Sequence, residues 1–152
     1  MKKQPFLKDY IKIADIYADR LTIALTKLQP LIPFSVQQLQ QQTPEQLSYT
    51  DMLTTRFGKL QAVIGAKVFP LVLDCLKEDA LAFIDTLNRL EKLGYLESVA
   101  WWLELREIRN AVTHDYPDDV LIYEHLNALI PKAHELLSFW ERLKKKVKLV
   151  SE

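Results

Sequence analysis

The segment from Arg106 to Pro117 combines side chains that could carry out acid–base chemistry on a phosphate. It reads Arg-Glu-Ile-Arg-Asn-Ala-Val-Thr-His-Asp-Tyr-Pro, and so contains two cations, an amide, an imidazole and a phenol. Histidine is the residue type most often used to move protons near neutral pH, so His114 is a candidate general acid or base. Arg109 and Arg106 can stabilise the negative charge of a phosphorane transition state. These residue types suit phosphodiester cleavage that needs no metal ion.

A helix that begins near Ser98 and ends close to His114 is predicted to position these side chains. Its apolar residues repeat with helical spacing and predict a core-facing stripe: Trp101, Leu105, Ile108 and Val112. A second stripe, roughly opposite, repeats every four residues: Arg106, Asn110 and His114. Arg109 lies on the flank of the helix. Because Pro117 disfavours helical geometry at Tyr116, the polar stripe is expected to end where the helix ends.

The pattern Arg109-x4-His114-x-Tyr116, with Asn110 directly after the arginine, resembles the signature of HEPN-domain proteins. It is most similar to the HepT branch, whose members are also called nucleotidyltransferase substrate-binding proteins. The similarity covers about the C-terminal two thirds of the chain and includes further positions: Arg56-Phe57, Phe83, Asp85, Leu87, Gly94, Trp102 and Arg106.

This resemblance implies a metal-independent endoribonuclease toxin that acts as a homodimer with a composite site at its interface. Arg109 and His114 would be catalytic, with Asn110 and Arg106 supporting them. One His114 per chain cannot easily act as both base and acid, and a two-fold dimer would supply the second copy. The resemblance also implies a partner, a minimal nucleotidyltransferase antitoxin that adenylylates Tyr116.

Each of these side chains also has a purely structural interpretation. His114 near a helix C-terminus can simply interact with the helix dipole. Arg109 could form a surface ion pair with Asp115 or Asp118, and Tyr116 could pack the corner before the proline. The alternative function is a non-catalytic helical subunit that presents substrate, or itself, to a nucleotidyltransferase. A structural bundle without activity is the third possibility.

Composition narrows the class of protein. The apolar fraction of 49% and the charged fraction of 26% are typical of a soluble globular domain. Twenty basic and twenty acidic residues give no net charge, so RNA would have to bind a local patch. The single cysteine, Cys75, fits a reducing compartment and is expected to be buried. No signal peptide, membrane span, zinc-ligand spacing or glycine-rich phosphate loop is found, so we predict a cytoplasmic protein without metal or cofactor.

The helical periodicity and the scarcity of glycine predict an all-α fold, an antiparallel helical bundle of four to five main helices that resembles HEPN domains. We expect one domain over 1–152, in which 1–42 is a possible N-terminal extension helix and linker. The predicted helices cover 5–28, 43–76 with a kink at Pro70, 80–93 capped by Asp79, 98–114, and 118–147 with a bend at Pro131. Residues 35–42 form either a short helix or an ordered linker. The lysine-rich end of the last helix, residues 144–148, is expected to be solvated, with RNA or an acidic partner as the alternative.

Overall fold

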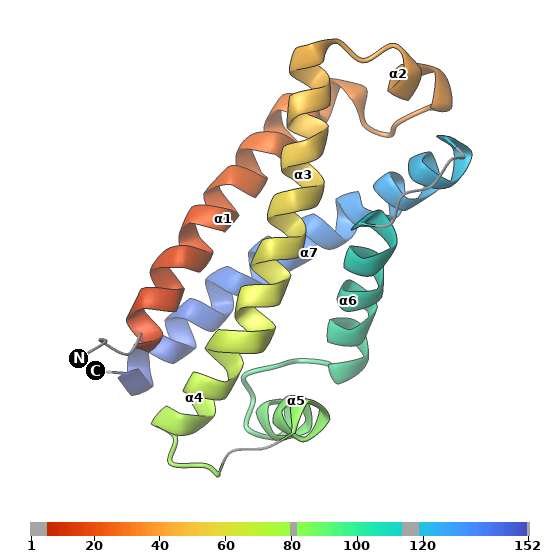
Figure 1. The fold of residues 1–152 in the computed structure, drawn as a ribbon. Helices are drawn as coiled ribbons and strands as arrows, with labels where there is room; N and C mark the ends of the chain where they lie inside the picture. Colours follow the sequence, from red (N-terminus) through yellow and green to blue (C-terminus); the bar gives the residue numbers. More distant parts are fainter. Residues whose placement is uncertain (1–5, 80–81, 114–118, 152) are drawn as a thin grey trace, which may run out of the picture.

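The chain folds into an all-α bundle, as the sequence predicts. The computed structural model describes residues 6–79, 82–113 and 119–151, and no strand occurs among them. Its elements are α1 (Leu7–Leu28), a 3-10 turn (Gln29–Leu31), α2 (Val36–Gln40), α3 (Pro44–Val63), a π-helical turn (Ile64–Val68), α4 (Phe69–Cys75), α5 (Phe83–Lys92), α6 (Val99–Thr113) and α7 (Asp119–Ser151) (Figure 1).

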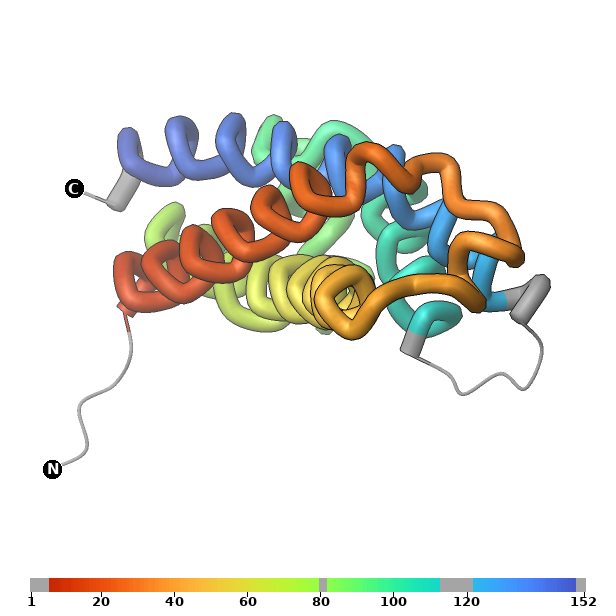
Figure 2. Tube along the Cα trace, turned by 90° about the horizontal axis from the view of Figure 1, so that it is seen from above, coloured from red at the N-terminus to blue at the C-terminus, as the bar shows by residue number. Residues whose placement is uncertain are grey.

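Three long helices make up the body of the bundle. α3 runs back alongside α1, and α1 lies between α3 and α7 (Figure 2). The start of α1 and the end of α7 lie at the same end of the molecule (Figure 1). The shorter α6 packs against both α3 and α7, and α5 packs against α4 and α6. The described part of the candidate segment, Arg106 to Thr113, belongs to this helix, and Arg109 within it contacts Gln61 of α3.

α1 contributes fully to the common core. Seven of its side chains are buried and join the same cluster as those of α3, α6 and α7: Leu7, Ala14, Ala18, Leu21, Ala24, Leu25 and Leu28. The polar segment that follows contains a short helix, α2, whose N-terminus is closed by a capping box between Ser35 and Gln38. Asn127 on α7 fixes the chain just before α2, because its amide donates to the carbonyl of Phe34 and accepts from its N–H, both at 2.8 Å.

The predicted kink near Pro70 takes the form of a π-helical turn. Proline has no N–H to donate to the carbonyl four residues earlier, so regular α-helical bonding cannot continue through this position. The five residues Ile64–Val68 wind more loosely, and the N–H of Phe69 donates to the carbonyl of Ile64, five residues back. Helical geometry then resumes in α4. Such turns inside helices are frequent at functional sites.

Local helix signals gave correct boundaries where the capping interactions lie close in sequence. Thr43 and Gln46 form the predicted capping box of α3. Gly94, at φ +86°, ends α5 in a left-handed conformation, and the Ser98 hydroxyl accepts from the N–H of Trp101 at 3.1 Å. α7 extends to Ser151 and contains Pro131 within it.

Two predictions were wrong. Asp79 does not cap α5, because the helix begins at Phe83 and its N-cap is Ala82, three residues later than expected. Cys75 is exposed. It occupies the last turn of α4 and does not lie among the buried side chains of this helix, which are Phe69, Val72 and Leu73. The core stripe of α6 is also shifted: Trp102 and Leu105 are buried, whereas Trp101 is only half-buried against the core.

Asp15 connects α1 to α7 through two side chains. Its carboxylate accepts from the indole N–H of the buried Trp140 at 2.8 Å and pairs with Lys144 at 2.8 Å. Burial lowers the pKa of Lys144, but hydrogen bonds with Asp15 and Glu141 outweigh this and raise it above the usual value. The pair therefore stabilises the fold at neutral pH, and on the alkaline side its contribution is lost as the pH rises through the raised, folded-state pKa of Lys144.

We predict that Asp15→Ala lowers the free energy of unfolding by about 1–3 kcal/mol, because it leaves the indole N–H of Trp140 buried without an acceptor. Asp15→Asn keeps an acceptor oxygen and removes only the ion pair, so it should cost about 1 kcal/mol or less. Urea denaturation of the two variants and the parent measures both values. Equal losses would show that the ion pair, and not the indole hydrogen bond, matters.

Candidate functional site

Arg109 is held in place by two amide side chains. It lies one turn before the end of α6 and is half-buried against α3. Its NH1 group donates to Oε1 of Gln61 on α3 at 2.5 Å. Its Nε and NH2 groups donate to Oδ1 of the neighbouring Asn110, at 3.4 and 3.2 Å. Because Gln61 is itself 2% exposed, the guanidinium has a fixed anchor on one side.

Two glycines seven residues apart on one side of α3 and its π-helical turn allow α6 to approach closely. A Cβ at Gly58 would lie 3.2 Å from Cγ of Arg109. A Cβ at Gly65 would lie 3.2 and 3.3 Å from two ring atoms of Trp102, a fully buried side chain. Because these glycines carry no side chain, Arg109 has room beside Gly58 and Trp102 has room beside Gly65.

The positive charge of Arg109 is not neutralised by the part of the chain that the structure describes. Among those residues no carboxylate lies within ion-pair distance of Arg109 or of Arg106. Burial, and then repulsion from Arg106, lower the pKa of Arg109. A guanidinium nevertheless stays charged at neutral pH. The partial negative charge at the C-terminus of α6 is favourable for a cation at this position.

Arg106 and Phe83 complete a small cavity beside Arg109. The guanidinium carbon of Arg106 lies 4.9 Å from the centroid of the Phe83 ring, a cation–π distance. A cavity of about 200 Å³ opens between these side chains and α3, lined by Gln61, Ala62, Gly65, Ala66, Phe83, Arg106 and Arg109. Its chemistry is that of an anion site: two cations, one amide and an otherwise small, apolar lining.

The structure brings together only part of the predicted site. Arg106, Arg109 and Asn110 lie on one side of α6, with Arg106 and Asn110 exposed, as their stripe predicts. His114 and Tyr116 lie outside the described residues. The described part of α6 runs to Thr113 and that of α7 starts at Asp119, so the helix end predicted from Pro117 also lies outside the described residues. His114 is the next residue in the chain.

Sequence reasoning missed Gln61 and the role of Phe83. A signal for Gln61 was present: it follows Phe57 by four residues and is thus a polar residue on the core-facing side of a helix. Such a residue needs a buried partner. The glycines at positions 58 and 65 were a second signal, since they indicate a close approach to α3. Neither signal identifies the partner, because Arg109 is 48 residues away in the sequence.

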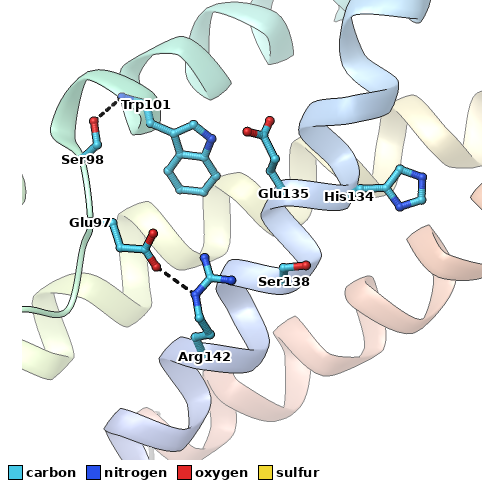
Figure 3. Close-up of a pocket in the computed structure, with 7 residues that line it drawn as sticks. All are labelled: Glu97, Ser98, Trp101, His134, Glu135, Ser138 and Arg142. Carbon is cyan, nitrogen blue, oxygen red and sulfur yellow. Dashed lines mark hydrogen bonds and ion pairs between the residues drawn. The ribbon is translucent and has the colours of Figure 1, made fainter.

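A second, larger cavity of about 370 Å³ lies between the start of α6 and α7, and its charges are already paired (Figure 3). Trp101 forms one wall, and Arg142 binds Glu97 at 2.8 Å across the cavity mouth. Glu135 pairs with Lys132 at 3.2 Å, and the imidazole of His134 points away from Trp101. The described residues that line this second cavity therefore leave no excess of positive charge comparable to that of Arg106 and Arg109.

Comparison with protein-family models, with curated proteins and with solved structures finds no match for this chain. Of the helices within 6–79, 82–113 and 119–151, none combines the length and the apolar character that a membrane crossing requires. Those residues also contain no group of three or more His, Cys, Asp or Glu side chains arranged to hold a metal ion.

We predict that Gly65→Ala lowers the free energy of unfolding by about 1 kcal/mol or more, because the buried Trp102 ring cannot move away from the added methyl group. Gly58→Ala should stay within about 0.5 kcal/mol of the parent, because the flexible Arg109 arm can shift and alanine favours the helix. Thermal or urea unfolding of the two variants compares them directly. A larger loss for Gly58→Ala would show that Arg109 is the more rigid neighbour.

Proposed function

We propose that this protein is a HEPN-type ribonuclease of the HepT kind, which cleaves RNA without a metal ion. The observation that supports this most directly is the pair formed by Arg106 and Arg109. Two cations without a carboxylate partner among the described residues, one of them anchored by neutral amides, provide a site for a phosphodiester. His114, which can move a proton, follows the end of the same helix.

In the proposed reaction the 2′-hydroxyl of the ribose attacks the adjacent phosphorus. His114 accepts the proton of the 2′-hydroxyl as the new oxygen–phosphorus bond forms. The bond from phosphorus to the 5′-oxygen then breaks, and a protonated imidazole returns a proton to that leaving oxygen. The products are a 2′,3′-cyclic phosphate and a 5′-hydroxyl end. Arg109 and Arg106 stabilise the doubly charged phosphorane between these steps.

We further propose that the active unit is a homodimer. The reaction needs a base and an acid in one turnover, and each chain contributes one His114. A two-fold axis near the exposed stripe of Arg106 and Asn110 would bring two such histidines to one phosphate. His114 of the partner subunit would then donate the proton to the 5′-oxygen.

Tyr116 gives this proposal a mode of control. A cognate minimal nucleotidyltransferase, the antitoxin, would adenylylate its phenol two residues from His114. The added nucleotide is bulky and anionic, so it would occupy the space for RNA and pair with the arginines. We place this toxin and antitoxin in the cytoplasm, where a single free cysteine is stable.

The test is cleavage of a mixed RNA pool in EDTA by the purified protein and by His114→Ala, with the oligomeric state measured in parallel. We expect the parent dimer to cut and the variant to lose at least about 100-fold in rate, the usual contribution of a general acid–base group. The products of the parent should carry 2′,3′-cyclic phosphate ends.

Equal cleavage by parent and variant would contradict the role of His114. If neither protein cuts, the nuclease proposal is wrong, and the non-catalytic subunit of a nucleotidyltransferase takes its place. Binding of the candidate nucleotidyltransferase and incorporation of AMP at Tyr116 would then be the informative measurements.

A further inference from the structure

A second group of cations lies on the side of α3 that faces α1, away from the Arg109 cavity. From residue 52 to residue 73 the chain contains three cations and no acidic residue: Arg56, Lys59 and Lys67. Within the described part of the protein, none of the three has a carboxylate within ion-pair distance. In a chain with no net charge, this is a local concentration of positive charge.

Two tyrosines of α1 position these cations along the seam between α1 and α3. The guanidinium of Arg56 and the ammonium of Lys59 both lie over the ring of Tyr17, at 5.5 and 5.8 Å from its centroid. Lys67 lies over the ring of Tyr10, at 5.9 Å. The two rings are seven residues apart on α1, which places them about 10 Å apart along the helix axis.

Arg56 and Lys59 repel each other at this ring. They are three residues apart on α3, so they are neighbours on the helix surface, and like charges at such spacing are unfavourable. Their attraction to the face of Tyr17 holds both cations beside the same ring despite this repulsion. An anion bound between them would remove it, as it would for Arg106 and Arg109 in the cavity on the other side of α3.

The surface between the two groups of cations carries short side chains. Lys59 and Ala62 are three residues apart and share one side of α3, and Ala62 and Ala66 line the Arg109 cavity. Ala66 is exposed and Ala62 half-exposed. Between Lys59 and the cavity, the short side chains of Ala62 and Ala66 therefore lie at the surface.

We propose that a single strand of RNA crosses the outer side of α3, with one phosphate at Arg106 and Arg109 and the flanking phosphates at Arg56, Lys59 and Lys67. This inference rests on the proposed nuclease function and adds to it the path of the substrate. A backbone of regularly spaced phosphates fits two groups of cations separated by the width of a helix. An acidic protein partner is the competing occupant, and the experiment distinguishes the two.

The test measures binding of a fluorescent single-stranded RNA by anisotropy at several salt concentrations, in a His114→Ala background that prevents cleavage. Lys59→Gln and Lys67→Gln are combined in one variant, since both lysines are exposed. The matched control combines Lys12→Gln and Lys92→Gln, which removes two lysines that are also exposed, from α1 and α5. Melting temperatures confirm that both variants are folded.

We expect the Lys59/Lys67 variant to bind RNA about tenfold more weakly or worse. The slope of its affinity against salt concentration, both on logarithmic scales, should fall by about 0.7 for each phosphate that a lysine no longer neutralises. The control should bind like the parent. The cleavage rate of the Lys59/Lys67 variant on the His114-containing background should fall at low RNA concentration and recover at saturation.

Three results would overturn the inference. If the parent cuts RNA but the Lys59/Lys67 variant binds and cuts as well as the control, the path is wrong while the nuclease stands. The same holds if that variant keeps its RNA affinity and loses binding of the cognate nucleotidyltransferase instead, because the seam would then be a protein interface. If the parent neither binds nor cuts RNA, the proposed function and this inference both fail.

Discussion

Two amide oxygens, and no carboxylate among the described residues, hold the guanidinium of Arg109. The charge and the packing of the surrounding cavity depend on these hydrogen bonds. Gln61 reaches it from a buried position on α3, and Asn110 from the next position on α6. A carboxylate in either place would hold the arginine more strongly but would also cancel its charge. Amides position the side chain and leave its charge available. Repulsion from Arg106 then makes an anion favourable at this point.

The placement of Arg109 beside Gln61 is linked to the way α6 packs against α3. Gly58 leaves room for the Arg109 arm beside α3, and Gly65 leaves room for the Trp102 ring. The π-helical turn that contains Gly65 lies directly before Pro70, so an irregularity in the backbone coincides with the lining of the cavity. Core packing and the placement of charge thus share the same few residues.

Much of the fold could be predicted from local sequence, because helix ends depend on neighbours in the chain. Thr43 and Gly94 each act within a few residues, and their positions were predicted correctly. Cys75 was assigned to the core because cysteine is usually buried. Its actual burial depends on which side of α4 the bundle covers, and this is decided by tertiary packing. For the site, the periodicity of α6 predicted the exposure of Arg106 and Asn110. It could not reveal Gln61 as the partner of Arg109, since that contact exists only after α3 and α6 have packed.

The central claim is that the positive charge of Arg109, which no carboxylate among the described residues neutralises, binds the RNA phosphate and stabilises its transition state. Gln61 allows the most direct measurement. Gln61→Glu places a carboxylate at the same buried position, while Gln61→Met keeps a similar shape without charge. We would compare RNA cleavage in EDTA and the melting temperature of both with the parent. We expect Gln61→Glu to be folded, with an ion pair to Arg109, and to lose at least about tenfold in cleavage rate relative to Gln61→Met. Full activity of Gln61→Glu, with its ion pair formed, would contradict the claim.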